Sequence, residues 1–519
     1  MILEVLLTVM WVLGLTALVR WRKKKFSVFK EMGVDGPEPN LIWGNILEYD
    51  GKKRVPALTE WGKKYGDVFG FYNGDIPTLV VKDLNLQQRI FISDFTDYTY
   101  RGSTMRTDEQ HPYLGTSLLH TRGIHWKKNR VCTSQGMTTY KFKQMWPHFQ
   151  NVADEFIEIL SHKADTGEEV HMEKPFQALA MDYAGQAAFG VHHSFQRDMD
   201  NPFLQRAAEV FPGVMRGLFH NIAHCTTTLG TIMTPLLWLH SMLGTFTYYV
   251  FDKHVYQVVD QRKKGNLKRS DLLQSILDAE VPQEKLSSGE LNNNDVKKDP
   301  KMISADDVAV NATILLVAAF GTTSTTLSYL IYVMAKYPDI QEKMKEEVEA
   351  ALRKSGELDY NTVMGLTYVN QVMQETLRMY PPVIIFTTRE AETDKEVNGL
   401  KIPAGTTIMA PTYQVHMDEK YWPEPEKFDP DRFSPENMKT QHPLAYQPFG
   451  MGPRNCAGMR LAIVEILYTA ARMVLEYRVE LGEKQQGEMH LDFYAMVSRP
   501  DKGPWIKFFK RKTESSVSA

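Results

Sequence analysis

The chain has 519 residues, with 60 lysines and arginines against 63 aspartates and glutamates, so its net charge is −3. This balance provides no large basic surface, and no nucleic-acid partner is expected. Three cysteines, Cys132, Cys225 and Cys456, are too few and too far apart for a disulfide framework or a zinc site.

Residues 1–21 are predicted to be an N-terminal transmembrane signal-anchor. Residues 1–19 are apolar except for Glu4 and two threonines, and a basic cluster begins at Arg20. This length just spans a bilayer, and the basic flank is retained in the cytosol. A cleaved secretory signal and a mitochondrial presequence both fit less well. We therefore expect a single-pass protein of the endoplasmic reticulum membrane, with residues 22–40 forming a basic stop and a Pro/Gly hinge.

Residues 41–510 are predicted to form one catalytic domain, mainly α with small β-sheets, followed by a polar tail at 511–519. Pro77 to Lys82 has the pattern of a strand, and Asn398-Gly399 predicts the turn of a hairpin over Lys395 to Ile402. The hydrophilic stretch from Val281 to Pro300 indicates an exposed loop rather than a linker between domains.

A long apolar helix is predicted from Val308 to Met334. Ser304, with Asp307 three residues later, forms a candidate capping box at its start. Gly321 inside the helix costs about 1 kcal/mol relative to alanine and favours a bulge. Thr322 follows, and its hydroxyl can either bond the carbonyl one turn earlier or handle protons for a reaction.

Two pairs of side chains have helical spacing. Glu375 and Arg378 share a face of the helix predicted from Leu366 to Met379, and each needs a partner if that face is buried. Trp126 and Arg130 lie one turn apart, which suits recognition of a carboxylate. A solvated surface pair is the alternative in both cases.

Residues 449–458 read Phe-Gly-Met-Gly-Pro-Arg-Asn-Cys-Ala-Gly. Gly450 and Gly452 allow tight turns, and a helical pattern begins at Ala457, so Cys456 is placed at or beside a helix N-terminus. The free amides there, with Arg454, favour a thiolate, which is a suitable ligand for haem iron. A small buried apolar residue is the alternative reading of one cysteine, but the five fixed positions around it disfavour that reading.

The spacing F-x-x-G-x-R-x-C-x-G resembles the haem-thiolate signature of the cytochrome P450 family. Glu375-Thr-Leu-Arg378 is similar to its E-x-x-R element, and Pro430-Asp-Arg432-Phe to its P-x-R-F element. The resemblance covers roughly residues 35–510 and implies the family's prism fold. The run from Lys420 to Phe428 is similar to the clan of animal drug- and xenobiotic-metabolising members.

The resemblance implies haem b (iron protoporphyrin IX) as cofactor, with Cys456 as the axial ligand of its iron. It implies a structural network of Glu375, Arg378 and Arg432, and Thr322 as the catalytic hydroxyl. Gly321 departs from the family by replacing the usual acid. Further haem contacts are implied for Trp126, Arg130, Arg389, Phe449, Arg454 and Gly458. The implied pocket walls are Ala319, Phe320, Val383, Ile384, Phe386 and the region from Phe493 to Val497.

Electrons must come from a partner, because no dinucleotide or flavin fingerprint follows a predicted strand. The resemblance implies an NADPH-dependent diflavin reductase carrying FAD and FMN, with cytochrome b5 as a further candidate. A basic docking face for the reductase is predicted at Lys127, Lys128, Lys141 and Lys143. The apolar run from Pro235 to Leu243 is expected either to contact membrane lipid near the substrate entrance or to pack in the core.

The predicted function is insertion of one atom of dioxygen into a lipophilic substrate, such as a xenobiotic, a steroid or a fatty acid. Two alternatives remain. One is a haem-thiolate isomerase or dehydratase that acts on a peroxide without a reductase, which the absence of an acid at Gly321 favours and Thr322 disfavours. The other is a haem-binding protein without catalysis.

Overall fold

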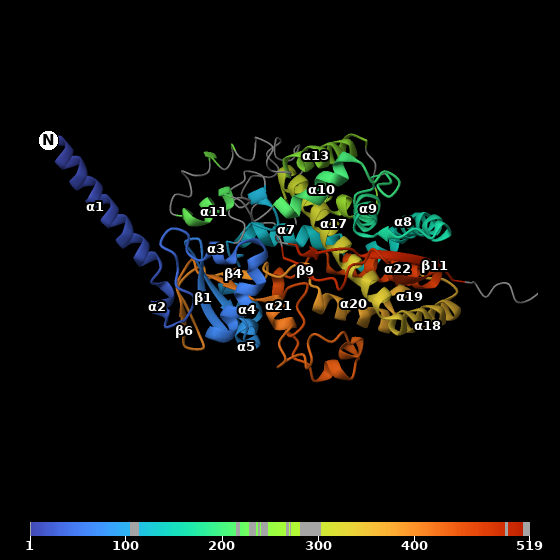
Figure 1. Ribbon diagram of the computed structural model, residues 1–519. Helices are drawn as coiled ribbons and strands as arrows, with labels where there is room; N and C mark the ends of the chain where they lie inside the picture. Colours follow the sequence, from blue (N-terminus) through green and yellow to red (C-terminus); the bar gives the residue numbers. More distant parts are fainter. Residues whose placement is uncertain are drawn as a thin grey trace, which may run out of the picture.

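The computed structural model describes residues 2–103, 114–191, 193–213, 218–227, 235–236, 239, 248–265, 269, 271–280, 303–493 and 497–511. Within them the protein is mainly helical with small sheets, as predicted (Figure 1). The predicted loop from Val281 to Pro300, most of the run from Pro235 to Leu243, and the tail beyond Arg511 lie outside the described residues.

Helices form most of the body, and an apolar helix precedes it. A π-helical segment, η5 (Tyr183–Ala188), continues one of them. The α-helices are α1 (Ile2–Lys25), α2 (Val28–Met32), α3 (Ile46–Tyr49), α4 (Arg54–Tyr65), α5 (Leu84–Gln88), α7 (Gly123–Gln135), α8 (Thr139–Thr166), α9 (Glu173–Asp182), α10 (Pro202–Gly213), α11 (Leu218–Cys225), α13 (Tyr248–Lys264), α14 (Leu272–Leu277), α17 (Ala305–Lys336), α18 (Pro338–Ser355), α19 (Tyr360–Met364), α20 (Thr367–Met379), α21 (Thr412–His416) and α22 (Met459–Glu476).

The largest sheet has the strand order β1-β2-β7-β4 and lies near the base of α1 (Figure 1). Its strands β1 and β2 are antiparallel, β2 and β7 are parallel, and β4 and β7 are antiparallel. A second sheet has the order β3-β11-β8, and two pairs, β5-β6 and β9-β10, complete the described sheets. The strands are β1 (Val68–Asn73), β2 (Ile76–Val81), β3 (Val170–His171), β4 (Thr388–Glu390), β5 (Lys395–Val397), β6 (Leu400–Ile402), β7 (Thr407–Met409), β8 (Tyr477–Leu481), β9 (Leu491–Asp492), β10 (Arg499–Pro500) and β11 (Trp505–Lys510).

The predicted hairpin is confirmed. Lys395 pairs with Ile402 across β5 and β6, and the turn residues Asn398 and Gly399 have φ angles of 51° and 82°. Two successive positive φ angles are the requirement of a type I′ turn, for which Asn-Gly is the preferred dipeptide. The predicted strand from Pro77 to Lys82 is also present, shifted by one residue, as β2.

Helix α17 is the central element, in contact with α9, α20, α22 and β8. The predicted capping box is confirmed: the Ser304 hydroxyl accepts from the Asp307 N–H, and the Asp307 carboxylate accepts from the Ser304 N–H. α17 is long and apolar enough to cross a membrane, but 78% of its most apolar window is buried within the protein. It is therefore a core helix, which is apolar on every side for that reason.

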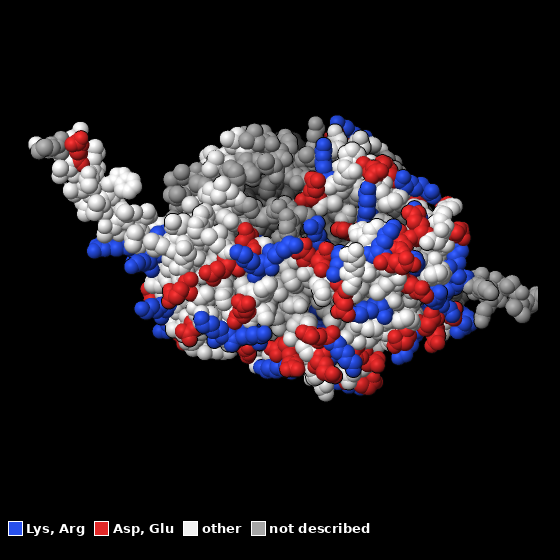
Figure 2. All heavy atoms as spheres, in the orientation of Figure 1, with Lys and Arg blue, Asp and Glu red and all other residues white. Residues whose placement is uncertain are grey.

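Helix α1 projects from the body as a mainly uncharged rod, with basic residues near its base (Figures 1 and 2). None of its most apolar window is buried, so it is a candidate membrane span. It continues to Lys25, four residues beyond the predicted end of the anchor.

The base of α1 is fixed to the body by Arg22, which is buried although it belongs to the basic cluster. Its guanidinium donates to the carbonyls of Leu41 (3.0 Å) and Ile42 (2.7 Å) and pairs with Asp75 (3.3 Å). Further along, a Cβ at Gly36 would lie 1.8 Å from the Gly70 carbonyl oxygen. The segment predicted to be a hinge is thus seated against the domain.

Candidate active site

The cysteine loop, residues 449–458, leads into α22. Gly450 and Gly452 have φ angles of 70° and 66°, in the left-handed region that favours glycine. The Cys456 N–H donates to the Phe449 carbonyl (2.8 Å), which closes the loop. The expected preformed loop is present, and Cys456 lies three residues before the first residue of α22.

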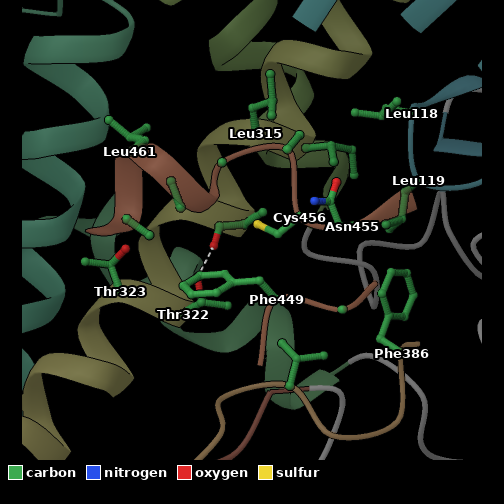
Figure 3. A pocket seen from close by; sticks show the side chains of 18 of the residues that line it. Leu118, Leu119, Leu315, Thr322, Thr323, Phe386, Phe449, Asn455, Cys456 and Leu461 are labelled. Carbon is green, nitrogen blue, oxygen red and sulfur yellow. Dashed lines mark hydrogen bonds between the residues drawn. The ribbon is translucent and has the colours of Figure 1, made fainter. Parts of the chain in front are cut away.

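The exposed surface of Cys456 faces a cavity of about 250 Å³ inside the protein (Figure 3). Burial raises the pKa of the Cys456 thiol, while the N–H groups of Gly458 and Met459 and the Arg130 guanidinium lower it. The net change in pKa is upward, so the helix terminus does not by itself produce the predicted thiolate. Arg130 contributes positive charge at the sulfur, whereas the guanidinium of Arg454, expected to do so, lies over the Trp126 ring.

Arg130 and Trp126 project from α7 to the cavity. Arg130 donates to the backbone oxygen of Asn455 (2.9 Å) and to its side-chain oxygen (2.6 Å), which ties α7 to the residue before Cys456. The Trp126 ring is buried, and the Arg454 guanidinium lies 4.5 Å from its centre. The two residues predicted from their one-turn spacing therefore both line the cavity beside the cysteine loop.

Three further arginines, Arg101, Arg389 and Arg454, line the same cavity. Each donates to backbone carbonyls, and each keeps one buried nitrogen without a hydrogen-bond partner: Nε of Arg101, Nε of Arg389 and Nη1 of Arg454. The carbonyl acceptors are those of Phe386 for Arg101 (2.5 Å), Thr388 and Met451 for Arg389 (2.7 and 3.0 Å), and Thr99 and Thr121 for Arg454 (both 2.6 Å).

Burial, and then repulsion among the guanidinium groups, lowers the pKa of all three. The pKa of Arg454 falls to about 8 and that of Arg101 to about 9, and the pKa of Arg389 falls well below its ordinary range. No ion pair with a carboxylate is found for any of them among the described residues. A buried group of cations without counter-ions is suited to an anionic ligand.

The opposite wall of the cavity comes from α17. Ala319 and Thr322 both line it, and the Thr322 hydroxyl donates to the Ala318 carbonyl (2.7 Å), the bond that most helical threonines make. α17 is α-helical at every position from Ala305 to Lys336, so the bulge expected at Gly321 is not formed. Thr322 is held at the cavity wall by a regular helix.

Of the predicted pocket walls, Ala319, Val383 and Phe386 line the cavity, whereas Phe320 and Ile384 are not among its lining residues. The latter two are 2% exposed and pack in the core. Phe320 lies on the side of α17 away from Ala319 and Thr322, because neighbouring helix positions differ by about 100°. Of the predicted region from Phe493 to Val497, residues 494–496 lie outside the described residues, and Val497 forms a backbone bridge with Val383.

The charged network lies away from the cavity. Glu375 and Arg378 are both fully buried and form two bonds, Arg378 Nε to Oε2 (2.7 Å) and Nη2 to Oε1 (2.8 Å). Arg432 Nε is 3.4 Å from Glu375 Oε1. The geometry brings together the three charges that the sequence singled out, and removal of one partner would leave a buried charge uncompensated.

The basic docking face requires a correction. Lys127 and Lys143 are exposed, but Lys128 is 6% exposed and is not available to a partner protein. Lys128 follows Lys127 on α7, and the rotation of the helix between neighbouring residues turns it inwards.

Among the charged residues of the cavity, sequence reasoning missed Arg101 and Glu465. Arg101 lies beside the bridge that pairs Tyr100 with Glu390, a contact between segments far apart in the chain. Glu465 lies nine residues after Cys456 on α22, where acidic residues are common on exposed helix faces. No local pattern marks either residue.

Comparison with known proteins places this geometry in a family. Residues 34–508 match the family model described as Cytochrome P450, so the chain belongs to the cytochrome P450 family. It is 30% identical over 509 residues to cytochrome P450 3A2 of Rattus norvegicus, covering 96% of both chains. It is 30% identical to cytochrome P450 3A14 of Cavia porcellus, over 97% of this chain and 96% of that one.

A further relative is the lithocholate 6-beta-hydroxylase of Mesocricetus auratus, 29% identical over 489 residues and 92% of each chain. The family and these relatives make the protein a cytochrome P450 monooxygenase, an oxidoreductase, and the family implies a haem cofactor.

The described residues fit a haem. The unpartnered nitrogens of Arg101, Arg389 and Arg454 suit the two propionate carboxylates of that cofactor. A Cβ at Gly458, beside the cysteine loop, would meet no atom within 4 Å, so the backbone there leaves room for a flat macrocycle. The thiol of Cys456 opens into the same cavity, as an iron ligand must.

Proposed function

We propose that this protein is a membrane-bound haem-thiolate monooxygenase that inserts one atom of dioxygen into a lipophilic substrate, with electrons from NADPH delivered by a diflavin reductase. The observation that supports it most is the convergence of Cys456, four arginines and the Thr322 wall on one cavity. Thiolate-ligated haem iron favours cleavage of the dioxygen bond when the cofactor is bound.

The residues around the cofactor have distinct roles in this proposal. Cys456 would hold the haem iron through its sulfur, and Arg130 holds the loop beside it through Asn455. Trp126 and the arginines, including Arg101, would hold the propionates of the cofactor, and Phe449 and Gly458 would border its macrocycle. The Thr322 hydroxyl donates its hydrogen to the Ala318 carbonyl, so its oxygen can still accept a hydrogen bond from a proton donor.

The substrate is apolar in this proposal. Most of the remaining cavity lining consists of aliphatic and aromatic side chains, and sites of this kind bind small molecules mainly through burial of apolar surface. Lithocholate, named in a relative, is an example of the size and class we infer. This apolar lining includes Leu118, Leu119, Leu315 and Phe386, which are labelled in Figure 3, and also Ile314 and Val383.

The reductase is inferred to approach the α7 side. Arg130 of α7 contacts the residue before Cys456, and Lys127 on the same helix is exposed, as is Lys143 on α8. Exposed positive charge near the cysteine loop would steer an acidic flavoprotein. Cytochrome b5 is proposed as a second acidic partner of the same face.

The membrane is proposed to be that of the endoplasmic reticulum, crossed once by α1, with the body in the cytosol. A helix of 24 residues with basic residues in its last turn has the length and charge asymmetry for this orientation. Deleting residues 2–19 should convert a protein that resists high-salt extraction of membranes into one that high salt releases.

The function is tested with purified protein, reductase, NADPH, a panel of steroids, bile acids, fatty acids and drugs, and isotopically labelled dioxygen. We expect products that carry one labelled oxygen atom, and a carbon monoxide band of sulfur-ligated haem that Cys456→Ala abolishes and Cys225→Ala retains. Rearrangement of an added hydroperoxide without reductase, or ligand-induced spectra without products, would contradict the proposal in favour of an isomerase or a binding protein.

A further inference from the structure

Glu465 is the only carboxylic acid among the described residues that line the cavity. It projects from α22 and is 1% exposed. The other ionisable side chains of this lining are the four arginines and Cys456. The arginines are the candidate partners of the cofactor's carboxylates, and the cysteine is the candidate iron ligand. Glu465 is therefore the one lining side chain with the chemistry of a proton donor.

The carboxyl group of Glu465 is half satisfied. Its Oε2 accepts a hydrogen bond from the Thr323 hydroxyl (3.1 Å), and its buried Oε1 has no hydrogen-bond partner. No cation pairs with it among the described residues. Burial raises the pKa of Glu465 to about 8, against the bond from Thr323, which lowers it. At neutral pH the group is held mainly as the uncharged acid.

The groups that face Glu465 from neighbouring elements carry no positive charge. Thr323 approaches from α17, and the Tyr183 phenol approaches from η5, where it shares a hydrogen bond of 2.9 Å with Thr469. Burial raises the pKa of Tyr183, and Glu465 contributes to that rise, so the phenol remains protonated at neutral pH. Among the described residues, no neighbouring cation stabilises the ionised form of Glu465.

Helix α17 has no acid of its own where it borders the cavity. Residues 318–326 are alanines, a phenylalanine, a glycine, threonines and a serine. Thr322 and Thr323 are consecutive: both line the cavity, and the second bonds Glu465. Among the described lining residues, the acidic group that contacts this part of α17 is therefore Glu465 of α22, through its bond with Thr323.

We propose that Glu465 is the proton-relay residue of the cavity, which releases protons for the reduction of dioxygen and regains them from solvent. The inference deepens the proposed monooxygenase function and rests on it. In that reaction the substrate R–H, dioxygen, two electrons from the reduced flavoprotein and two protons give R–OH and water. Each proton that Glu465 releases leaves a carboxylate, which the Thr323 O–H stabilises until it is protonated again.

The matched variants are Glu465→Gln and Glu476→Gln. The first keeps the size of the side chain and an oxygen that can accept from Thr323, but it has no acidic proton. The second makes the same change at an exposed position at the end of the same helix. Glu465→Asp restores the acid on a shorter side chain.

Infrared spectroscopy of the purified protein at neutral pH is the first measurement, and it needs no turnover. The carbonyl band of a buried protonated carboxyl group should be present in the wild type and in Glu476→Gln and absent in Glu465→Gln. A band that survives in Glu465→Gln belongs to another residue and overturns the assignment.

Coupling is the second measurement, as product formed per NADPH consumed, with hydrogen peroxide measured in parallel. Because positioned proton donors contribute about 10²- to 10⁴-fold, Glu465→Gln should lower this ratio roughly tenfold or more and raise peroxide, while its carbon monoxide band persists. Its solvent isotope effect on product formation should differ from that of the wild type, and Glu465→Asp should recover part of the coupling. Unchanged coupling and isotope effect in Glu465→Gln would show a structural role only and overturn the proposal.

If Glu465→Gln does not assemble with haem, Thr323→Val decides instead. It leaves the acid in place and removes the bond that lowers its pKa, so the pH above which coupling declines should move upwards; no movement overturns the proposal. A wild-type protein that forms no product with the reductase refutes the proposed function itself, and the infrared band then still shows whether Glu465 holds a proton.

Discussion

The arginines of the cavity oppose folding when considered one residue at a time, because each is buried and the guanidinium groups repel one another. Arg101 has a pKa lowered to about 9 by burial and then by Arg130, and its Nε has no partner. Such a charge costs free energy until an anion neutralises it. The same arginines, which reduce the stability of the haem-free protein, would contribute binding affinity for a cofactor with two carboxylates.

Replacing Arg101 by alanine should therefore have opposite effects on the two forms of the protein. The haem-free form should become more stable, because a buried repelling charge is lost. The haem-bound form should release its cofactor to a haem-scavenging protein roughly tenfold faster or more, since a hydrogen bond to a charged group contributes about 1.5–3 kcal/mol. Stopped-flow transfer measures the rate. Arg89→Ala, which removes an exposed arginine, is the control. Equal rates of haem release in the two variants would show that Arg101 does not bind the cofactor.

At the scale of elements, local signals predicted most of what is observed. The Asn398-Gly399 hairpin and the Ser304 capping box are confirmed, because a turn type and a helix cap depend on residues within four positions of each other. The cysteine loop is of the same kind, since Gly450 and Gly452 determine its turns.

The sequence pattern did not predict which side of a helix faces the cavity. α17 is apolar on every side, so its sequence could not separate Phe320, in the core, from Ala319, at the cavity. Arg101 and Glu465 enter the site through contacts across more than a hundred residues, with Phe386 and Thr323 respectively. Lys128 was misplaced because a run of lysines gives no sign of which one turns inwards.

The junction between α1 and the body depends on one side chain of the basic cluster. Arg22→Ala should leave the Asp75 carboxylate, which is 1% exposed, without its cation. Thr227 still donates to Asp75 through its hydroxyl (2.5 Å), so we expect a loss of about 3 kcal/mol of local stability, the low end for a broken buried pair. Hydrogen exchange should then accelerate at residues 41–45 and 74–76. Lys23→Ala, at the exposed neighbouring residue, should leave the exchange rates unchanged. Equal protection in both variants would contradict the role of Arg22 in fixing α1 to the body.

At the scale of the whole molecule, the cavity lies where α17 and α22 meet, so two largely buried helices supply polar side chains to its lining. α17 contributes Thr322 and Thr323, and Glu465 comes from α22. The polar groups are held within apolar packing that excludes bulk water, and the ionisation state of each then affects the stability of the entire fold.

The pH dependence of unfolding follows from this coupling. In the unfolded chain Glu465 titrates near 4.5, whereas burial raises its pKa in the folded protein to about 8. Between these values the folded state holds a proton that the unfolded state has lost, so the contribution of this group to stability is complete below about pH 4.5 and declines as the pH rises to 8. A shift of this size corresponds to a loss on the order of 4 kcal/mol. Urea unfolding of the holoprotein at about pH 5 and pH 8 measures this loss of stability. Between the two pH values Glu465→Gln should lose less stability than the wild type, by a difference on the order of 4 kcal/mol, and Glu476→Gln should match the wild type. Parallel losses in all three proteins would mean that Glu465 is ionised in the folded state.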